Sequence, residues 1–288
     1  MSSSGTYRDN MSKLKTLLHI IRHTIFDQVK QKSFMVIFII CGLFVLGIKN
    51  CYQGNYTING QQVDGAMVAL GVSKGMFNFV ATVAMIIAAL FSMRIIRREQ
   101  DDGTQSTILS KPVSRYEYII GKAAGLWIVT FLFMFALHAI IFAIGFIKTG
   151  AAMPGFLLAS LLCSIDILFV VSFVMLLSLY LPDFACFLIV SALGLFSYIG
   201  DGIYSVSRSK MVQDAFTGNA SHLPDISFWK IVYLALPKLS TVQFFASSFI
   251  SNETFDYAGL IHPMINIVLY CAVSIGLLLV LFRKQDIA

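Results

Sequence analysis

Residues 97–122 read RREQDDGTQSTILSKPVSRYEYIIGK and are the most charged segment of the chain. An apolar run lies on each side, over residues 76–93 and 123–147. Only 12% of the 288 residues are charged, so this segment stands out as a polar connection between two hydrophobic elements. The apolar runs decide the fold class, and residues 97–122, called the polar connection below, are the first candidate for a functional surface.

The composition is that of an integral membrane protein. Hydrophobic residues make up 57% of the chain and the mean hydropathy is +0.79, whereas soluble domains use roughly 45–50% apolar residues. A bilayer core about 30 Å thick requires roughly 20 apolar residues per helix. Spans are expected over residues 34–48, 76–93, 123–147, 156–181, 184–204 and 264–282. The sequence therefore predicts an all-α integral membrane protein with a six-helix transmembrane bundle.

An amphipathic segment precedes the first apolar run. Between residues 14 and 29, leucine, isoleucine and valine recur at helical spacing, and basic residues occupy the opposite face. The basic residues are Lys13, Lys15, Arg22, His23 and Lys30. Such a helix lies in the plane of the lipid headgroups. We therefore expect a cytoplasmic N-terminal region with an interfacial helix over residues 1–33, a single transmembrane domain over 34–282 and a cytoplasmic tail over 283–288.

Lysine and arginine set the orientation, because basic residues in short loops near the ends of spans resist translocation. With the N-terminus inside, fourteen of the 21 Lys and Arg residues fall on the inner side. This predicts a multi-pass protein of the cytoplasmic (inner) membrane with both termini and the polar connection in the cytoplasm. The formal net charge of +6 then reflects basic flanks at the membrane surface, and no nucleic-acid partner is expected.

The long outer loop over residues 207–262 contains an apolar stretch, 227–250, that is interrupted by Lys230, Pro237 and Lys238. We expect short helices there, at the outer membrane face or re-entering between the spans. A seventh crossing, which would place the C-terminus outside, is the competing interpretation. Just before this loop, Asp201 lies between two glycines, and this pattern favours a helix break with the carboxylate in headgroups or water.

The polar connection carries signals for a helix end and for a helix start. Three arginines mark the inner end of the second span, and Gly103 would loosen a helix that continued. Pro112 sets a break, because the residue before a proline disfavours helix. Ser114 and Glu117 then form the Ser-x-x-Glu pattern of a capping box, which starts the helix of the third span. The connection is therefore predicted to be a short helical element between two long helices.

This pattern resembles the cytoplasmic loop of the ABC type-2 permeases, a family of exporter-type transporter subunits. The residues that carry the resemblance are Glu99, Gly103, Thr104, Leu109, Pro112, Ser114, Arg115, Gly121 and Lys122. The basic helix before the first span is similar to the N-terminal elbow helix of that family, and six spans match its usual count. The resemblance covers most of the chain in layout and the polar connection in detail.

The resemblance implies that the polar connection is a coupling helix that docks on a cytoplasmic ABC ATPase. It also implies two permease copies, as a homodimer or as a heterodimer with a related permease, which work with two ATPase copies in the lipid bilayer. The ATPase-coupling residues implied are Glu99, Asp102, Gly103, Thr104, Leu109, Pro112, Ser114, Arg115, Glu117, Gly121 and Lys122. ATP and Mg²⁺ would be bound by the partner ATPase.

The chain has no phosphate-binding loop around its Gly121-Lys122 pair. In a Gly-x-x-x-x-Gly-Lys-Ser/Thr loop, Tyr116 would stand where the first glycine belongs and Ala123 where the hydroxyl residue belongs. We therefore expect the chain to be no enzyme and to hold no cofactor of its own. Four of the five cysteines lie in apolar runs and none forms a Cys-x-x-Cys pair, so no metal site is expected.

Asp166, in the fourth apolar run, is an ionisable group inside the membrane, which costs at least ~2.5–3.5 kcal/mol unless it is paired or protonated. His138 in the third run lies at a comparable depth and is the expected partner, because consecutive antiparallel spans pack together. Two interpretations stay open. One is a proton- or cation-linked site on a transport pathway, and the other is a neutral Asp, or an Asp–His hydrogen bond, that holds two helices together.

Two other classes of function compete with an ATP-driven exporter. An ATP-independent carrier or channel would favour inverted repeats and broken helices, and no convincing internal repeat is visible. An intramembrane enzyme would need a catalytic constellation, and Asp166 with His138 alone is too small a set. The leading prediction is therefore the permease subunit of an ATP-binding-cassette exporter.

Overall fold

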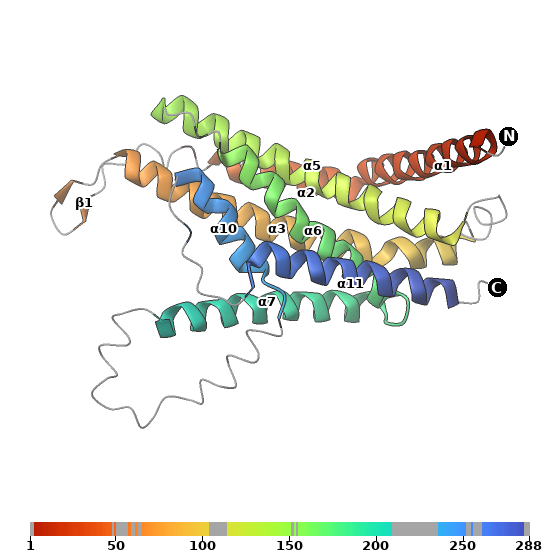
Figure 1. The fold of residues 1–288 in the computed structure, drawn as a ribbon. Coiled ribbons are helices and arrows are strands. Elements are labelled where there is room, and N and C mark those ends of the chain that lie inside the picture. Colours follow the sequence, from red (N-terminus) through yellow and green to blue (C-terminus); the bar gives the residue numbers. More distant parts are fainter. Residues whose placement is uncertain are drawn as a thin grey trace, which may run out of the picture.

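The computed structural model describes residues 3–47, 49, 57–58, 61–62, 65–103, 114–150, 153, 155–208, 236–251, 255 and 261–284. Over these residues the chain forms eight helices and one small hairpin. The helices are α1 (Ser3–Lys30), α2 (Lys32–Gly47), α3 (Gly65–Asp101), α5 (Arg115–Thr149), α6 (Gly155–Ser178), α7 (Asp183–Arg208), α10 (Leu239–Ser251) and α11 (Pro263–Lys284). The hairpin pairs β1 (Thr57–Ile58) with β2 (Gln61–Gln62) in antiparallel orientation. The long helices lie side by side in one bundle (Figure 1), which confirms the predicted all-α class.

Each of the six apolar runs lies largely within one of the helices α2, α3, α5, α6, α7 and α11. The helices α3 and α5 have 37 and 35 residues, so at 1.5 Å per residue each is more than about 50 Å long. They therefore extend beyond an apolar core about 30 Å thick. Five helices are long and apolar enough to cross a membrane, and the number becomes six if α2 and the end of α1 form one bent span.

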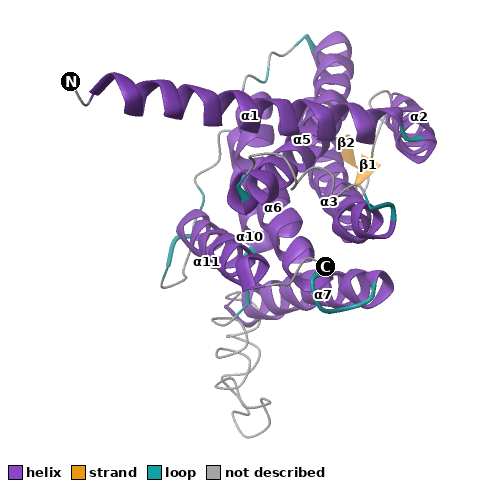
Figure 2. Ribbon diagram, turned by 90° about the vertical axis from the view of Figure 1, so that its right-hand side faces the viewer, coloured by secondary structure: helices purple, strands orange, loops and turns teal. Residues whose placement is uncertain are grey.

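The bend between α1 and α2 gives the N-terminal region the shape of an elbow. The two axes differ by 67° at Gln31, the residue between the helices. The first turns of α1 project beyond the rest of the bundle (Figure 2). With 16 residues, α2 is short for a span on its own, which is consistent with a helix that starts inside the amphipathic segment.

Two glycines allow α1 to approach α5 closely. A Cβ added at Gly121 would lie 2.7 Å from Ile20 Cγ2, and one added at Gly125 would lie 2.7 Å from Thr24 Cβ. Both distances are far shorter than a van der Waals contact between carbon atoms, about 3.5–4.0 Å. The Gly-x-x-x-Gly spacing, which brings both positions to one face of a helix, therefore fixes the elbow against the third span.

The central element is α6, which contacts α3, α5, α7, α10 and α11. The helix α10, from the long loop, is inserted against it. A Cβ at Gly155, the first residue of α6, would lie 2.0 Å from the Phe249 carbonyl oxygen of α10, so only glycine fits there. With 13 residues, α10 is shorter than the roughly 17 residues that a crossing requires. In the described part of this loop the chain therefore enters the bundle and does not cross it.

Candidate functional site

The two described ends of the polar connection lie at the same end of the bundle as the C-terminal turn of α11 (Figure 1). A hydrogen bond of 3.1 Å from Arg115 Nη1 to the Arg283 carbonyl oxygen joins the start of α5 to α11. Three of the predicted coupling residues, Thr104, Leu109 and Pro112, fall outside the described residues. The described part of the candidate site is therefore the base of the polar connection, where α3 ends and α5 begins.

Local backbone chemistry ends α3 and starts α5. Gly103 has a φ of +66°, the left-handed conformation that commonly follows the end of a helix. At the start of α5, the Glu117 N–H donates to Ser114 Oγ at 3.2 Å, and the Ser114 N–H donates to Glu117 Oε2 at 3.0 Å. These reciprocal bonds confirm the predicted capping box.

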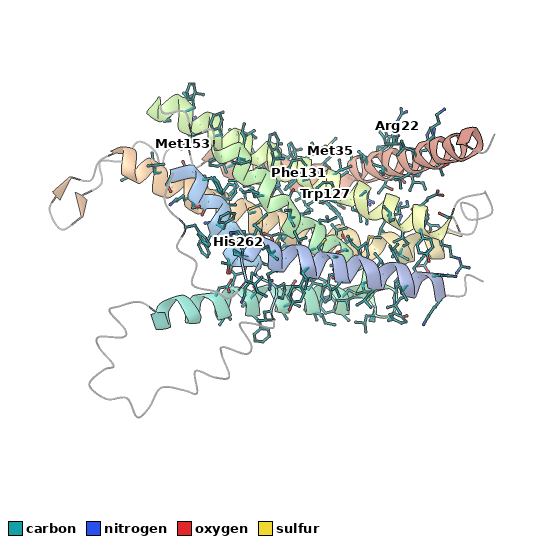
Figure 3. The ribbon with its side chains drawn as sticks, in the orientation of Figure 1. Arg22, Met35, Trp127, Phe131, Met153 and His262 are labelled. Atoms are coloured by element: carbon teal, nitrogen blue, oxygen red, sulfur yellow. The ribbon has the colours of Figure 1, made fainter. Side chains whose placement is uncertain are left out.

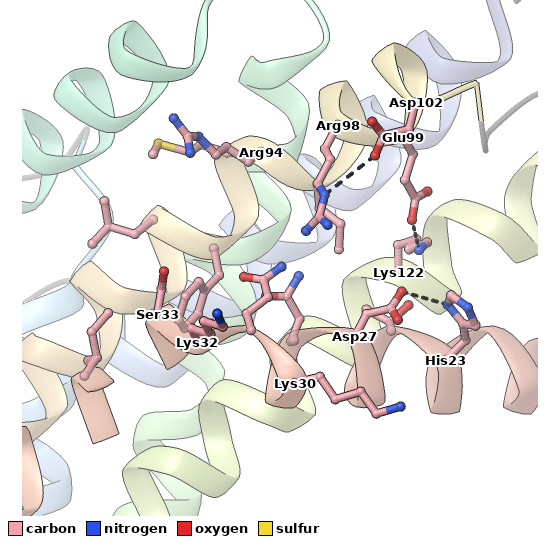
Figure 4. Close-up of a pocket in the computed structure, with 18 residues that line it drawn as sticks. His23, Asp27, Lys30, Lys32, Ser33, Arg94, Arg98, Glu99, Asp102 and Lys122 are labelled. Atoms are coloured by element: carbon pink, nitrogen blue, oxygen red, sulfur yellow. Dashed lines mark hydrogen bonds and ion pairs between the residues drawn. The ribbon is translucent and has the colours of Figure 1, made fainter. Parts of the chain in front are cut away.

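A buried ion pair joins α3 to α5 just inside these ends. Glu99 of α3 accepts hydrogen bonds from Lys122 Nζ and from the Tyr118 hydroxyl, both of α5. The side chains of Lys122 and Glu99 are only 3% and 14% exposed, and Tyr118 stacks on Phe282 of α11 with ring centroids 5.9 Å apart. Figure 4 shows the Glu99–Lys122 contact between the two helices. The three residues Glu99, Tyr118 and Lys122, called the buried clamp below, tie α3 and α5 together and pack against α11.

The predicted coupling residues thus divide into two groups. The side chains of Glu99 and Lys122, together with the backbone at Gly121, are occupied by contacts inside the protein. The remaining described positions are exposed or half-buried at this end: Asp102, Gly103, Ser114, Arg115 and Glu117. A pattern of residue types alone gave no reason to separate these groups, because the burial depends on how α3, α5 and α1 pack.

A second set of ion pairs joins α3 to α7. Asp183, the first residue of α7, lies 3.6 Å from Arg94 and 3.8 Å from Arg97, measured between carboxylate oxygen and Nε. Sequence reasoning missed Asp183. The signal for it was its place in the short turn between the fourth and fifth runs, which the predicted topology puts at the same end of the spans as the arginines. A carboxylate in the first turn of a helix is also favoured by the helix dipole.

The elbow helix presents its basic residues outward and polar residues inward. Lys15, Arg22 and Lys30 are exposed, and Arg22 projects from α1 away from the bundle (Figure 3), with its guanidinium 5.5 Å from the centre of the Phe26 ring. The side chain of Lys13 lies outside the described residues. On the side facing the bundle, the sequence places a threonine and a glutamine, Thr24 and Gln28, which are 1% and 5% exposed.

The expected contact between His138 and Asp166 is wrong. Both side chains are buried, but His138 pairs through Nδ1 with Ser160 Oγ at 2.9 Å and through Nε2 with the Phe77 carbonyl oxygen at 3.2 Å. Neither carboxylate oxygen of Asp166 has a hydrogen-bond partner among the described residues. The depth count ignored rotation: six residues after Ser160, the helix has turned so that Asp166 points about 120° away and lies about 9 Å further along the axis.

A further cluster secures α10. Asp201 of α7 accepts hydrogen bonds from the Thr241 N–H at 3.2 Å and from the hydroxyls of Thr241 and Ser240. Lys238 Nζ lies 3.8 Å from the same carboxylate. Burial lowers the pKa of Lys238 from 10.5 to about 8, and the charge of Asp201 opposes that shift. Contrary to the expected helix break, α7 continues through Asp201. The Asp201 carboxylate, expected in headgroups or water, caps the N-terminus of α10 instead.

The described residues form neither a hydrolase nucleophile turn nor a metal site. Residues 71–75, GVSKG, fit the Gly-x-Ser-x-Gly spacing of a hydrolase nucleophile, which requires a sharp turn between a strand and a helix. Here all five residues lie within α3, so the serine is not on such a turn. Over the described part of the chain, no group of three or more His, Cys, Asp or Glu residues is placed to hold a metal ion.

The chain matches a known protein family over most of its length. A family model described as "ABC-2 family transporter protein" matches residues 18–287. The match begins within α1 and includes every later helix, the polar connection and the long loop. No curated protein matches the chain.

Proposed function

Because the chain belongs to the ABC-2 family of transporter proteins and is the membrane permease of an ABC transporter, we propose that it exports its substrate and is driven by a separate cytoplasmic ATPase. The ATPase docks on the polar connection, residues 97–122. ATP and Mg²⁺ bind to that partner. Two copies of the permease, identical or related, work with two ATPase copies.

The observation that carries this proposal is the buried clamp at the base of the polar connection. A docking element can transmit force only if it is attached rigidly to the helices that must move. Here the connection leaves α3 next to Glu99 and enters α5 through a complete capping box at Ser114, and Lys122 and Tyr118 hold the two helices together. A displacement of the connection therefore moves both helices.

The contact surface for the ATPase consists of the exposed and half-buried residues at this end. Asp102 is 61% exposed in its side chain, and Gly103 and Ser114 are also exposed. Arg115 and Glu117 are half-buried at the edge of this surface. The connection thus offers both signs of charge to a soluble partner, while the buried clamp supports it from behind.

The positions of basic residues support a cytoplasmic location for this end. The end of α3 carries Arg94, Arg97 and Arg98, the start of α5 carries Arg115, and the last turn of α11 carries Arg283 and Lys284. Such clusters at the ends of spans remain on the cytoplasmic side. We propose that this end and both termini face the cytoplasm of a cell whose inner membrane holds the protein.

Site-specific crosslinking in cells tests the docking surface. A photoreactive amino acid replaces Asp102 or Glu117, and the matched control replaces Lys148, which is exposed at the opposite end of α5. We expect an ABC ATPase, identified by mass spectrometry, to be captured at the first two positions and not at Lys148. Absence of an ATPase adduct at both positions, or equal capture at all three, would show that the polar connection is not the docking site.

A further inference from the structure

A pocket of about 910 Å³ opens where the elbow helix bends, between α1, the start of α2 and the end of α3. This volume is within the range of small-molecule sites, ~300–1,000 Å³. Figure 4 shows the residues that line it, with Lys32 and Arg98 on different elements. The bend joins a helix of interfacial character to an apolar helix, so the pocket lies where lipid headgroups would lie.

The lining of the pocket has a polar part and an apolar part. The polar part includes Asp27 and Gln28 of α1 and Lys32 at the bend. The apolar part includes Ile37 of α2 and Phe91 of α3, which lie deeper along the two helices. A free phosphate would use only the polar part, whereas an amphipathic molecule matches both.

Gln28 provides an unmet hydrogen-bonding group in this pocket. Its side chain is 5% exposed, and its Oε1 atom has no hydrogen-bond partner among the described residues. Leaving a buried acceptor unsatisfied costs about 1–3 kcal/mol. An amide oxygen can only accept, so the missing partner must be an N–H or O–H donor.

Charges of both signs remain available in the lining. Lys122 is paired with Glu99. Arg98 lies 3.7 Å from Asp102, but its side chain is 64% exposed, so its guanidinium keeps N–H donors for a second acceptor. Lys32 has no ion-pair partner among the described residues and is exposed at the bend. Among the described residues, Asp27 has His23 as its one ion-pair partner, at 3.0 Å, and its side chain is half exposed. A ligand with both a negative and a positive group fits this arrangement better than a simple anion does.

We propose that this pocket binds the headgroup of a phospholipid that carries a phosphate and a primary ammonium, as phosphatidylethanolamine does. The phosphate lies between Lys32 and Arg98, and the ammonium donates to Gln28 Oε1 and Asp27. The first carbons of the acyl chains follow Ile37 and Phe91. The lipid thereby connects the elbow helix to the end of α3, and this role does not depend on the identity of the ATPase or of the transported substrate.

Lipid competition tests the proposal on the unmodified protein. Full-length protein in mixed micelles is offered equal amounts of phosphatidylethanolamine and phosphatidylcholine with the same acyl chains, and the lipids that stay bound are counted by native mass spectrometry. Phosphatidylcholine has the same net charge but no N–H donor. We expect about fivefold or greater preference for phosphatidylethanolamine, because only its ammonium satisfies Gln28. Equal retention of the two lipids overturns the proposal.

Variants locate the preference. Gln28→Leu and Lys32→Gln should each reduce retention of phosphatidylethanolamine by about fivefold, whereas Lys15→Gln should not, since Lys15 is an exposed lysine of α1 outside the pocket. Millimolar inorganic phosphate is added in a separate arm and should not displace the lipid. A loss in Lys15→Gln as large as that in Lys32→Gln, unchanged retention in Gln28→Leu, or displacement by phosphate would each contradict a lipid site at the bend.

Discussion

Breaking the buried clamp should cost far more stability than breaking an exposed ion pair at the same end of the bundle. In Lys122→Met, the Glu99 carboxylate keeps only the Tyr118 hydroxyl as a donor among the described residues, and only 14% of its side chain is exposed. Removing one partner of a buried ion pair costs about 3–5 kcal/mol, because the other charge is left without compensation. We therefore expect Lys122→Met to lower the free energy of unfolding by about this amount.

The size of the interaction itself follows from a double-mutant cycle with Glu99→Gln, measured by equilibrium unfolding in one fixed detergent. The double variant has no buried charge left unpaired, so it should lose less than the sum of the two single losses. The matched control is Arg98→Met, which removes one charge from the pair with Asp102, whose side chains are 64% and 61% exposed. Such an exposed pair contributes about 0–1 kcal/mol.

Two results would refute the buried clamp. In the first, the losses of Lys122→Met and Glu99→Gln add up within about 0.5 kcal/mol, as they do for residues that do not interact. In the second, Lys122→Met costs no more than Arg98→Met. Either result would mean that the polar connection is not held rigidly at its base, and the proposed route of force from the ATPase would lose its support.

Three further tests, of a close helix contact, of buried polar groups and of pH dependence, use unfolding in detergent as the common measurement. Gly125→Leu should lower the free energy of unfolding by about 1–3 kcal/mol, because the new side chain overpacks against α1. The control Gly194→Leu should not lower it, because a Cβ there meets no atom within 4 Å. Equal losses in the two variants would contradict the close contact between α1 and α5. Asp166→Leu should leave the free energy of unfolding unchanged or raise it, since the carboxyl group has no partner among the described residues. Ser160→Ala should lower the free energy of unfolding by about 1–3 kcal/mol, because His138 loses the hydrogen bond to the Ser160 hydroxyl. Between pH 8 and 10.5, Lys238 keeps its proton in the unfolded chain and has lost it in the folded chain. The free energy of unfolding should therefore rise with pH over this range, by up to about 3 kcal/mol. Lys238→Met should abolish that rise.

Signals that act over a few residues were readable from the sequence, whereas contacts between helices were not. Apolar runs predicted the positions of the six helices α2, α3, α5, α6, α7 and α11, because length and hydropathy suffice for that inference. The capping box was predictable because Ser114 and Glu117 lie within one turn. The partner of His138 was not predictable, because each residue turns a helix by 100° and a depth count leaves that rotation undefined. The same ambiguity hid the inward orientation of Glu99 and Lys122 within a stretch that looked uniformly solvated.

Consecutive positions on α5 connect the polar connection to two different helices. Gly121 lies against Ile20 of α1, and Lys122, about 100° further around the helix, pairs with Glu99 of α3. The start of α5 is thus held on two sides within two turns of its capping box. A push on the polar connection therefore reaches the elbow and the end of α3 together. In the proposed mechanism the elbow therefore moves with α5, and a lipid bound at the bend would affect how easily the permease changes conformation.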